Sequence, residues 1–386
     1  YLIKYKIITK DFAKYLSTFK YTGDLYAMPE GSVFFPGEPI VRITAPLIEG
    51  NLLTMMMLNN LTSNTIFSSK AARAVIACRD KVLIGPWAMR AHSWESSMKC
   101  SRAAYMTGGT IGGPSFFRKY GLDGKKISTV IIGYHAFIKS FDDELEAMRA
   151  ISKYANDFIN ISVMVDTYDV LPGIRKAIKV AKEMEKRGKK MFSITIDSGD
   201  LYRTAVRARN MLDKAGLNYI KITLASNLDE YKINTMMKKK VPADTFVIAT
   251  EGVTSADAPK LETVFKIARL QGPGETKYMA KLTPGKESYP GLKNVYRKYK
   301  NGKLQKDFIG LNDEKKLGLP LLKEYIKNGE LVKKLPSLDK IRTYCMNSIK
   351  QLPKKYYDLN KEYVYPVKIS PKLQNLLEQV RKKHVG

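Results

Sequence analysis

The chain has 386 residues, of which 44% are hydrophobic and 27% are charged, and its formal net charge is +29. This composition is that of a globular protein with a sizeable core, and it excludes disordered, collagen-like and coiled-coil chains. The length predicts two domains. No run approaches the roughly 20 consecutive apolar residues of a membrane span, and residues 1–20 lack a signal-peptide core, so we expect no membrane partner.

Cysteine usage and charge distribution narrow the class further. Cys78, Cys100 and Cys345 form no paired motif, so we expect neither a disulfide framework nor a zinc site, and we infer a reducing, cytoplasmic location. Lys and Arg are spread along the chain beside acids, which favours a solvated basic surface. Nucleic-acid binding, with a steep salt dependence, is the less favoured alternative. Because the chain begins with Tyr1 and not with Met, we expect further residues upstream.

The first part of the chain is predicted to contain helices around a short β segment. Residues 1–20 and 50–78 have helical periodicity, the latter as two helices. Residues 25–49 alternate short apolar runs with Pro and Gly turns and are predicted to form strands. We expect the methionine-rich run at residues 55–58 to pack in a core.

From residue 82 onward, apolar β-rich runs alternate with amphipathic helices, the order that builds a parallel sheet. The predicted strands are 82–85, 127–134, 161–165, 192–196, 219–225, 246–249 and 278–282. The predicted helices are 142–157, 173–187, 201–215, 229–238 and 258–268. This count favours a closed or nearly closed α/β barrel. Residues 283–386, punctuated by Pro, are predicted to pack back on the first segment.

Polar side chains follow several of the predicted strands. In an α/β barrel these strand ends converge on one mouth, where ligands bind. The strand-end groups are Trp87 with Arg90, His135, and the residues at 166–169, 197–200, 226–227 and 250–251.

The turn at residues 197–200 reads Asp-Ser-Gly-Asp. Carboxylates at such a mouth can hold Mg²⁺ or a ribose diol, and glycine lets a phosphate approach the backbone. Helix capping by Ser198 or Asp200 explains the same residues equally well. The similar turn at residues 166–169 on the preceding strand favours a functional role.

The remaining candidates each have a structural alternative. His135 suits a nucleophile or general base oriented by a carboxylate, and a hydrogen-bonded structural histidine is the alternative. Trp87 and Arg90 suit a small aromatic acid, because an indole stacks on a ring and a guanidinium binds a carboxylate. An interface Trp beside a surface Arg is the alternative there. The glycines at 108–109 and 112–113 indicate a phosphate loop only weakly.

Taken in order, these residues resemble the nicotinate phosphoribosyltransferase family, in its bacterial-type branch, over essentially the whole chain. The stretches that carry the resemblance are residues 21–24, 29–31, 35–39, 69–73, 101–105, 140–147, 165–169, 197–201, 289–291 with 293 and 295–297, and 365–367 with 370–371. The resemblance implies a type II phosphoribosyltransferase fold. In that fold an irregular α/β barrel, here residues 82–283, accompanies an α+β domain built from the N- and C-terminal segments, here 1–81 and 284–386.

The resemblance also implies a reaction. Nicotinate and phosphoribosyl pyrophosphate give nicotinate mononucleotide and pyrophosphate in NAD biosynthesis, with Mg²⁺ required, ATP hydrolysed through a phosphorylated histidine, and a homodimer as the enzyme. His135 matches that histidine, Asp166 the acid that supports it, and Asp197 the acid at the ribose, metal and pyrophosphate. The implied substrate-binding positions are Trp87 and Arg90 for nicotinate, and Ser198, Gly199, Asp200, Ser226, Asn227 and Thr250 for ribose and phosphate.

The chain also departs from the family pattern. Thr195 stands where the family has Arg, Ile131 and Ile132 stand where it has Gly-Thr, residues 86–88 replace Asp-Phe-Gly, and residues 247–250 lack the glycines of its phosphate loop. Side chains in that loop obstruct a phosphate at the backbone. A truncated or degenerate paralogue that binds a nucleotide or a partner is therefore an alternative to the enzyme. Nicotinamide or quinolinate as the base is a narrower alternative.

Overall fold

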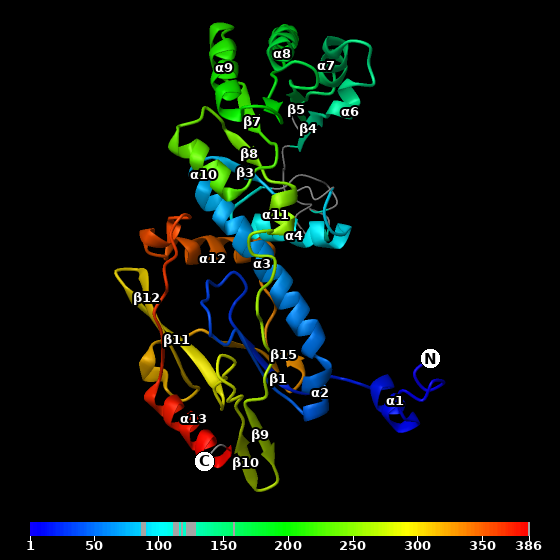
Figure 1. The fold of residues 1–386 in the computed structure, drawn as a ribbon. Coiled ribbons are helices and arrows are strands. Elements are labelled where there is room, and N and C mark those ends of the chain that lie inside the picture. The colour runs from blue at the N-terminus through cyan, green and yellow to red at the C-terminus, as the bar shows by residue number, and fades with distance from the viewer. Residues whose placement is uncertain (86–89, 111–115, 117–118, 121–128, 157–158, 385–386) are drawn as a thin grey trace.

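The computed structural model describes residues 1–85, 90–110, 116, 119–120, 129–156 and 159–384. Figure 1 shows two parts: an upper part with a parallel sheet and its helices, and a lower α+β part. None of the helices in these ranges is both long and apolar enough to cross a membrane. The three cysteines are buried and free.

The upper part is built on a curled sheet of six parallel strands in the order β3-β8-β7-β6-β5-β4. The strands are β3 (Val82–Ile84), β4 (Thr129–Gly133), β5 (Ile159–Met164), β6 (Ser193–Ile196), β7 (Lys221–Leu224) and β8 (Thr245–Val247). Its helices are α4 (Trp94–Met106), α6 (His135–Ile138), α7 (Glu144–Ser152), α8 (Val170–Glu185), α9 (Leu201–Lys214), α10 (Glu230–Lys238) and α11 (Thr250–Thr254). The irregular barrel is confirmed as a half-barrel, since β3 and β4 do not pair within the described ranges.

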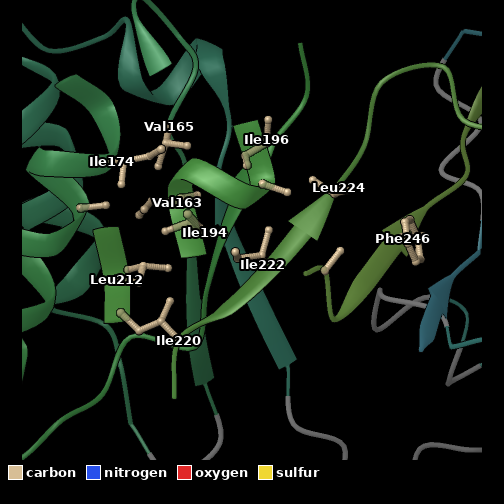
Figure 2. Packing of buried hydrophobic residues seen from close by; sticks show 14 of the residues in the cluster. Val163, Val165, Ile174, Ile194, Ile196, Leu212, Ile220, Ile222, Leu224 and Phe246 are labelled. Atoms are coloured by element: carbon tan, nitrogen blue, oxygen red, sulfur yellow. The ribbon is translucent and has the colours of Figure 1, made fainter. Parts of the chain in front are cut away.

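Alternation along the strands gives this sheet one apolar face. On β6, Ile194 and Ile196 are fully buried in a cluster with Ile222 of β7 and with Ile174 and Leu212 of the covering helices α8 and α9. Figure 2 shows these side chains gathered between the strands and the helices. Because successive residues of a strand point to opposite faces, this packing sets which residues lie on the other face.

The opposite face carries buried hydroxyls. Ser193 Oγ donates to Ser162 Oγ at 2.8 Å, and Ser162 Oγ lies 2.9 Å from Thr195 Oγ1. All three residues are less than 5% exposed. Thr195 therefore belongs to a hydrogen-bonded hydroxyl ladder across β5 and β6.

The lower part joins both ends of the chain. A four-stranded sheet has the order β15-β14-β1-β2, and a second has the order β13-β11-β12-β16. The strands are β1 (Asp24–Ala27), β2 (Val41–Thr44), β11 (Lys293–Lys300), β12 (Lys303–Leu311), β13 (Leu319–Pro320), β14 (Lys323–Lys327), β15 (Glu330–Leu331) and β16 (Val367–Ile369). The helices are α1 (Lys10–Ser17), α2 (Leu47–Leu52), α12 (Leu338–Lys350) and α13 (Pro371–His384). Pairing of β1 with β14 confirms an α+β domain built from both segments.

One long helix, α3 (Thr54–Cys78), runs from the lower part to the upper part (Figure 1). Lys70 on α3 lies 2.8 Å from the fully buried Glu230 of α10 and 2.7 Å from Asp257. Arg73 lies 2.8 Å from the same Glu230. Two cations on one helix face thus compensate a carboxylate that burial alone strongly disfavours. The contact fixes α3 against the first turn of α10.

A second buried charge cluster lies in the lower part. Arg297 Nη2 lies 2.6 Å from Asp307 Oδ2, and the Tyr365 hydroxyl donates to Asp307 Oδ1 at 3.1 Å. The Glu38 side chain is also fully buried, 4.0 Å from Arg297, and its Oε2 accepts from Phe35 N–H. Burial and the neighbouring Asp307 raise the pKa of Glu38 to about 9. The raised pKa favours a protonated Glu38 beside the ion pair of Arg297 and Asp307.

The helix predicted at residues 258–268 is wrong. No helix occurs there, and the segment runs extended toward the lower part, with Thr263 and Phe265 half-buried and Val264 exposed. Thr62 of α3 donates to Thr263 across this contact at 2.9 Å. Alternation of buried and exposed residues, together with β-branched side chains, favours extended backbone over helix.

The strand predicted at residues 278–282 is also wrong as a member of the parallel sheet. The chain forms an antiparallel hairpin of β9 (Arg269–Gly272) and β10 (Glu275–Tyr278), which ends where the predicted strand begins. The core role expected for residues 55–58 fails as well. Met55 is 84% exposed and Met56 is 55% exposed, because only one face of α3 finds a partner at this end.

Candidate functional site

The carboxyl ends of the parallel strands bring His135, Asp166, Asp197 and Ser226 together. His135 is the first residue of α6, directly after β4, while Asp166 and Asp197 follow β5 and β6. These three strands are neighbours in the sheet, so residues far apart in sequence reach one edge. The convergence expected for strand-end residues is therefore present for this group.

His135 is held between a hydroxyl and a carboxylate. Its Nδ1 lies 3.0 Å from Thr167 Oγ1, and its Nε2 lies 3.8 Å from Asp197 Oδ2. The histidine side chain is 40% exposed, so a ligand can reach the ring. Thr167 is not among the predicted site residues. Its position directly after the strand-end acid Asp166 is the sequence feature that could have indicated it. Asp166, expected beside the histidine, makes its hydrogen bonds elsewhere.

Asp166 organises the turn that carries Asp197. One of its oxygens, Oδ2, accepts hydrogen bonds from the Asp197 N–H and from the Ser198 hydroxyl, both at 2.7 Å. Its other oxygen, Oδ1, is buried and has no hydrogen-bond partner among the described residues. A buried carboxylate oxygen without a donor is costly, so Oδ1 is suited to meet a cation or donor from a ligand.

The Asp197 carboxyl group has a raised pKa. Desolvation is the largest cause, followed by the nearby Asp166 charge, while the charges of His135 and Arg90 and the Ser226 N–H lower it. Two carboxylates so close favour a positive charge between them. The opposing influence of Arg90 shows that this guanidinium acts on the same group.

Close packing fixes the position of Asp166. Gly173 in the first turn of α8 approaches the end of β5 so closely that a Cβ there would lie 1.9 Å from the Val165 carbonyl oxygen. Asp166 follows Val165 directly. Glycine at 173 therefore lets α8 pack against β5 without displacing the site.

The sequence left two interpretations of the Asp-Ser-Gly-Asp turn, ligand binding and helix capping, and the structure supports a different one for different residues. Asp200 caps α9, because its Oδ1 accepts from the Arg203 N–H at 3.0 Å. Gly199 has a positive φ of 71° and needs glycine for the turn. Ser198 instead reaches Asp166. Capping thus explains Asp200, while Ser198 belongs with the strand-end acids.

The turn after β7 has an unusual backbone. Ser226 and Asn227 both have positive φ, 80° and 47°. Left-handed residues other than glycine are uncommon and are often found at binding sites. The Lys232 ammonium donates to the Asn227 carbonyl at 2.6 Å and stabilises this turn. The backbone N–H of Ser226 donates to the Asp197 carboxyl group.

Other predicted residues are less closely tied to this group. Thr250 begins α11 after β8, and within the described ranges no contact joins its side chain to His135, Asp166 or Asp197. Trp87 lies outside the described residues. In place of the family's Gly-Thr, Ile131 of β4 pairs with Ile161 of β5 and packs against the core.

Comparison with known proteins decides the family. The model of the nicotinate phosphoribosyltransferase N-terminal domain matches residues 1–62, and that of the C-terminal domain matches residues 319–377. A nicotinate phosphoribosyltransferase of Mycobacterium tuberculosis is 34% identical over 375 residues, covering 96% of this chain and 78% of the relative. The chain belongs to the nicotinate phosphoribosyltransferase family. The Bacillus subtilis nicotinate phosphoribosyltransferase is 32% identical, with 89% of this chain and 74% of the relative covered.

Solved structures agree on the fold of this nicotinate phosphoribosyltransferase family member. Human nicotinic acid phosphoribosyltransferase superposes with a TM-score of 0.77 at 18% identity, over 97% of this chain and 86% of the human chain. A Pyrococcus furiosus nicotinate-nucleotide pyrophosphorylase gives 0.71 at 24% identity, over 92% and 85%. The half-barrel and its α+β companion are thus shared with both.

Proposed function

We propose that the chain joins nicotinate to phosphoribosyl pyrophosphate, giving nicotinate mononucleotide and pyrophosphate, as a step in NAD biosynthesis. The observation that carries this proposal is the strand-end group in a chain of this family, with His135 3.8 Å from Asp197. In the reaction the ring nitrogen of nicotinate bonds to the ribose C1, and the bond from C1 to pyrophosphate breaks. The electron pair of that bond leaves with pyrophosphate.

The acids suit this chemistry. Positive charge develops on the ribose as pyrophosphate departs, and carboxylates at fixed positions stabilise such charge. Asp197 is 37% exposed and can face the ribose, while Asp166 holds the Asp197 backbone in place. Arg90, whose charge reaches Asp197, supplies a cation for the nicotinate carboxylate.

We extend the proposal to magnesium. No set of three or more metal-binding side chains occurs in the described ranges, but Mg²⁺ in phosphate enzymes often takes one or two carboxylates, with phosphate oxygens and water. Asp166, whose Oδ1 has no hydrogen-bond partner among the described residues, and Asp197, whose pKa is raised, are the residues that would hold this ion. When bound, Mg²⁺ neutralises the departing pyrophosphate.

We also propose that ATP phosphorylates His135. A ring nitrogen forms the bond to the γ-phosphorus while the bond from that phosphorus to the ADP oxygen breaks, and water later hydrolyses the phosphohistidine. Thr167 holds the ring at Nδ1, whereas Nε2 lies 3.8 Å from Asp197, beyond hydrogen-bond distance, so Nε2 keeps its in-plane lone pair for the γ-phosphorus. The phosphate adds negative charge beside Asp197, and this change alters the affinity of the site for anionic substrates.

A homodimer is the assembly that we propose. No residue of α1 is buried, although Thr9 caps the helix and Phe12, Tyr15 and Phe19 pack together on one face. Tyr1 is 86% exposed, and Leu47 at the start of α2 and Met55 at the start of α3 are exposed as well. An apolar arm of this size in water is unfavourable, and a second subunit is the partner that we expect for it.

A product assay tests the function. The purified chain is incubated with nicotinate, phosphoribosyl pyrophosphate, Mg²⁺ and ATP, beside His135→Ala and the matched control His384→Ala in α13. We expect nicotinate mononucleotide from the wild type and from H384A, and product lower by about 10²-fold or more from H135A. A folded wild-type chain that makes no product contradicts the proposal and favours the degenerate paralogue, whose phosphate loop lacks glycine at residues 247–250.

A further inference from the structure

One lysine of the long helix α3 joins the segments that follow two strands of the parallel sheet. Lys70 Nζ lies 2.8 Å from Glu230 Oε2 and donates to Asp257 Oδ1 at 2.7 Å. Glu230 is the first residue of α10, after β7, and Asp257 lies three residues beyond the end of α11, after β8. These two strands are neighbours in the sheet. A single ammonium group therefore ties together two adjacent segments that follow the strand ends.

Most of this ionic network is shielded from water. The Lys70 side chain is 6% exposed and the Glu230 side chain is fully buried, whereas that of Asp257 is 36% exposed. Arg73, one turn further along α3, donates to Glu230 Oε1 at 2.8 Å. A buried ion without a partner is strongly unfavourable, and paired ions compensate for their desolvation only in a well-fixed geometry. The network therefore holds the first turn of α10 in a defined position against α3.

Both segments contain backbone that needs support from its surroundings. Ser226 and Asn227 have positive φ, and so does Ser255, with a φ of 46°, two residues before Asp257. Such conformations are unfavourable for residues other than glycine and persist only where neighbouring contacts fix them. Lys70 binds a carboxylate a few residues beyond each of these points. The same side chain thus supplies a fixed contact to both segments.

The segment after β7 is hydrogen-bonded to the backbone that carries Asp197. The Ala225 N–H donates to the Ile196 carbonyl at 2.9 Å, and Ile196 directly precedes Asp197. Only four residues separate Ala225 from Glu230, and one of them, Leu228, is 2% exposed and belongs to the main core cluster. This short connection is packed along its length. A shift of Glu230 therefore displaces the turn that lies beside Asp197.

We propose that Lys70 is a positioning residue for phosphoribosyl pyrophosphate. It acts through Glu230, which fixes the turn at residues 226–227 beside Asp197, and Asp257 anchors the same ammonium group to the segment after β8. This inference rests on the proposed function, since it takes the ribose as the group that Asp197 faces. Lys70 does not act on the substrate itself, because its ammonium group is buried and already paired with two carboxylates.

A double substitution separates positioning from stability. Lys70→Met leaves Glu230 buried with one cation fewer, so we expect a lower Tm. In the double variant Lys70→Met/Glu230→Gln the uncompensated carboxylate is gone, and we expect most of the lost Tm to return. The KM for phosphoribosyl pyrophosphate is expected to rise about tenfold or more in both variants, while the KM for nicotinate changes less than about threefold. Lys70→Arg keeps a cation for both acids and is expected to restore most of the affinity.

Two single substitutions accompany the double variant. Asp257→Asn changes a partly exposed side chain and leaves Glu230 paired, so the chain is expected to fold, with a KM for phosphoribosyl pyrophosphate raised about threefold. Arg149→Met is the matched control, because Arg149 of α7 binds Glu183 of α8 at 2.9 Å and 2.7 Å. Both residues lie toward the C-terminal ends of helices that begin at the strand ends. We expect R149M to keep both KM values.

Amide hydrogen exchange locates the effect in the structure. Exchange of the Ala225 N–H is expected to rise in K70M/E230Q and not in R149M. Unchanged exchange in the double variant, or an equal rise in the KM values of both substrates, overturns the inference. A wild-type chain that makes no product contradicts the proposed function. An active wild type whose folded K70M/E230Q and D257N variants keep their KM for phosphoribosyl pyrophosphate contradicts this inference alone.

Discussion

The molecule holds two pairs of carboxyl groups in opposite conditions. At the strand ends, Asp166 and Asp197 lie close together, the nearest imidazole nitrogen is 3.8 Å from Asp197, and the Asp197 side chain is 37% exposed. In the lower part, Glu38 and Asp307 have fully buried side chains, and Asp307 is bonded to Arg297 and to a tyrosine. Both pairs have similar residues, yet only the first is open to a ligand.

The difference between the two pairs shows which acidic side chains stabilise the fold and which can bind a ligand. A buried carboxylate that is fully bonded by a guanidinium has no free capacity, and it serves the structure. A half-exposed carboxylate whose neighbours are incomplete keeps its capacity for a substrate or a metal. Exposure separates the two roles, because Glu38 Oε1 also has no hydrogen-bond partner among the described residues, yet the side chains of Glu38 and Asp307 are fully buried and that of Asp197 is 37% exposed.

The largest effect is expected at the open pair. Asp197→Asn removes the charge that faces the ribose, and we expect kcat/KM to fall about 10³-fold with little change in Tm. Asp213→Asn, on the surface of α9, is the control. Steady-state kinetics beside thermal unfolding checks this. A D197N variant with wild-type activity would contradict the catalytic role of the strand-end pair.

The closed pair is expected to give the reverse result. Asp307→Asn leaves Arg297 buried without its carboxylate, and we expect the free energy of unfolding to fall by about 3–5 kcal/mol. Urea unfolding measures this loss. Asp313→Asn breaks an exposed pair with Lys372 and should cost less than about 1 kcal/mol. If folded D307N loses catalysis as completely as D197N, the lower acids are not merely structural.

A smaller effect is expected at the histidine. Thr167→Val removes the hydroxyl 3.0 Å from His135 Nδ1 at nearly constant volume. We expect kcat to fall about tenfold, the size of one lost hydrogen bond, and Thr167→Ser to restore most of it. Rapid-quench measurement of phosphohistidine formation locates the effect. Equal activity of the Val and Ser variants would contradict a functional role for the Thr167 hydroxyl.

The smallest expected effect is a change in how steeply the free energy of unfolding falls as pH rises. Because folding raises the pKa of Glu38 from its ordinary value to about 9, the unfolded chain releases this proton first as pH rises. The stabilisation is complete below the ordinary pKa and is lost as pH rises through the folded one. Glu38→Gln should therefore show a shallower fall in unfolding free energy between about pH 5 and about pH 9. Identical slopes for both chains would contradict the protonated state of Glu38.

Sequence patterns predicted the half-barrel because its strands are short apolar runs between amphipathic helices, as at residues 192–196. They failed at residues 258–268, where charge and apolar residues mimic a helix but tertiary contacts hold the backbone extended. Strand-end convergence located His135 and Asp197. It could not show that Thr167 is the ring partner or that Asp200 caps a helix, because both facts depend on side-chain direction within a turn.

The pairing of β1 with β14 has a consequence for how the protein is made. Asp24 and Lys327, which meet beside these strands, are 303 residues apart in the chain. The parallel strands of the half-barrel, by contrast, mostly pair with neighbours in sequence. Closing a long loop delays distant pairing, so local units form first. During synthesis, the half-barrel is therefore expected to fold before β14 has left the ribosome, while the hairpin of β1 and β2 is still without this partner strand.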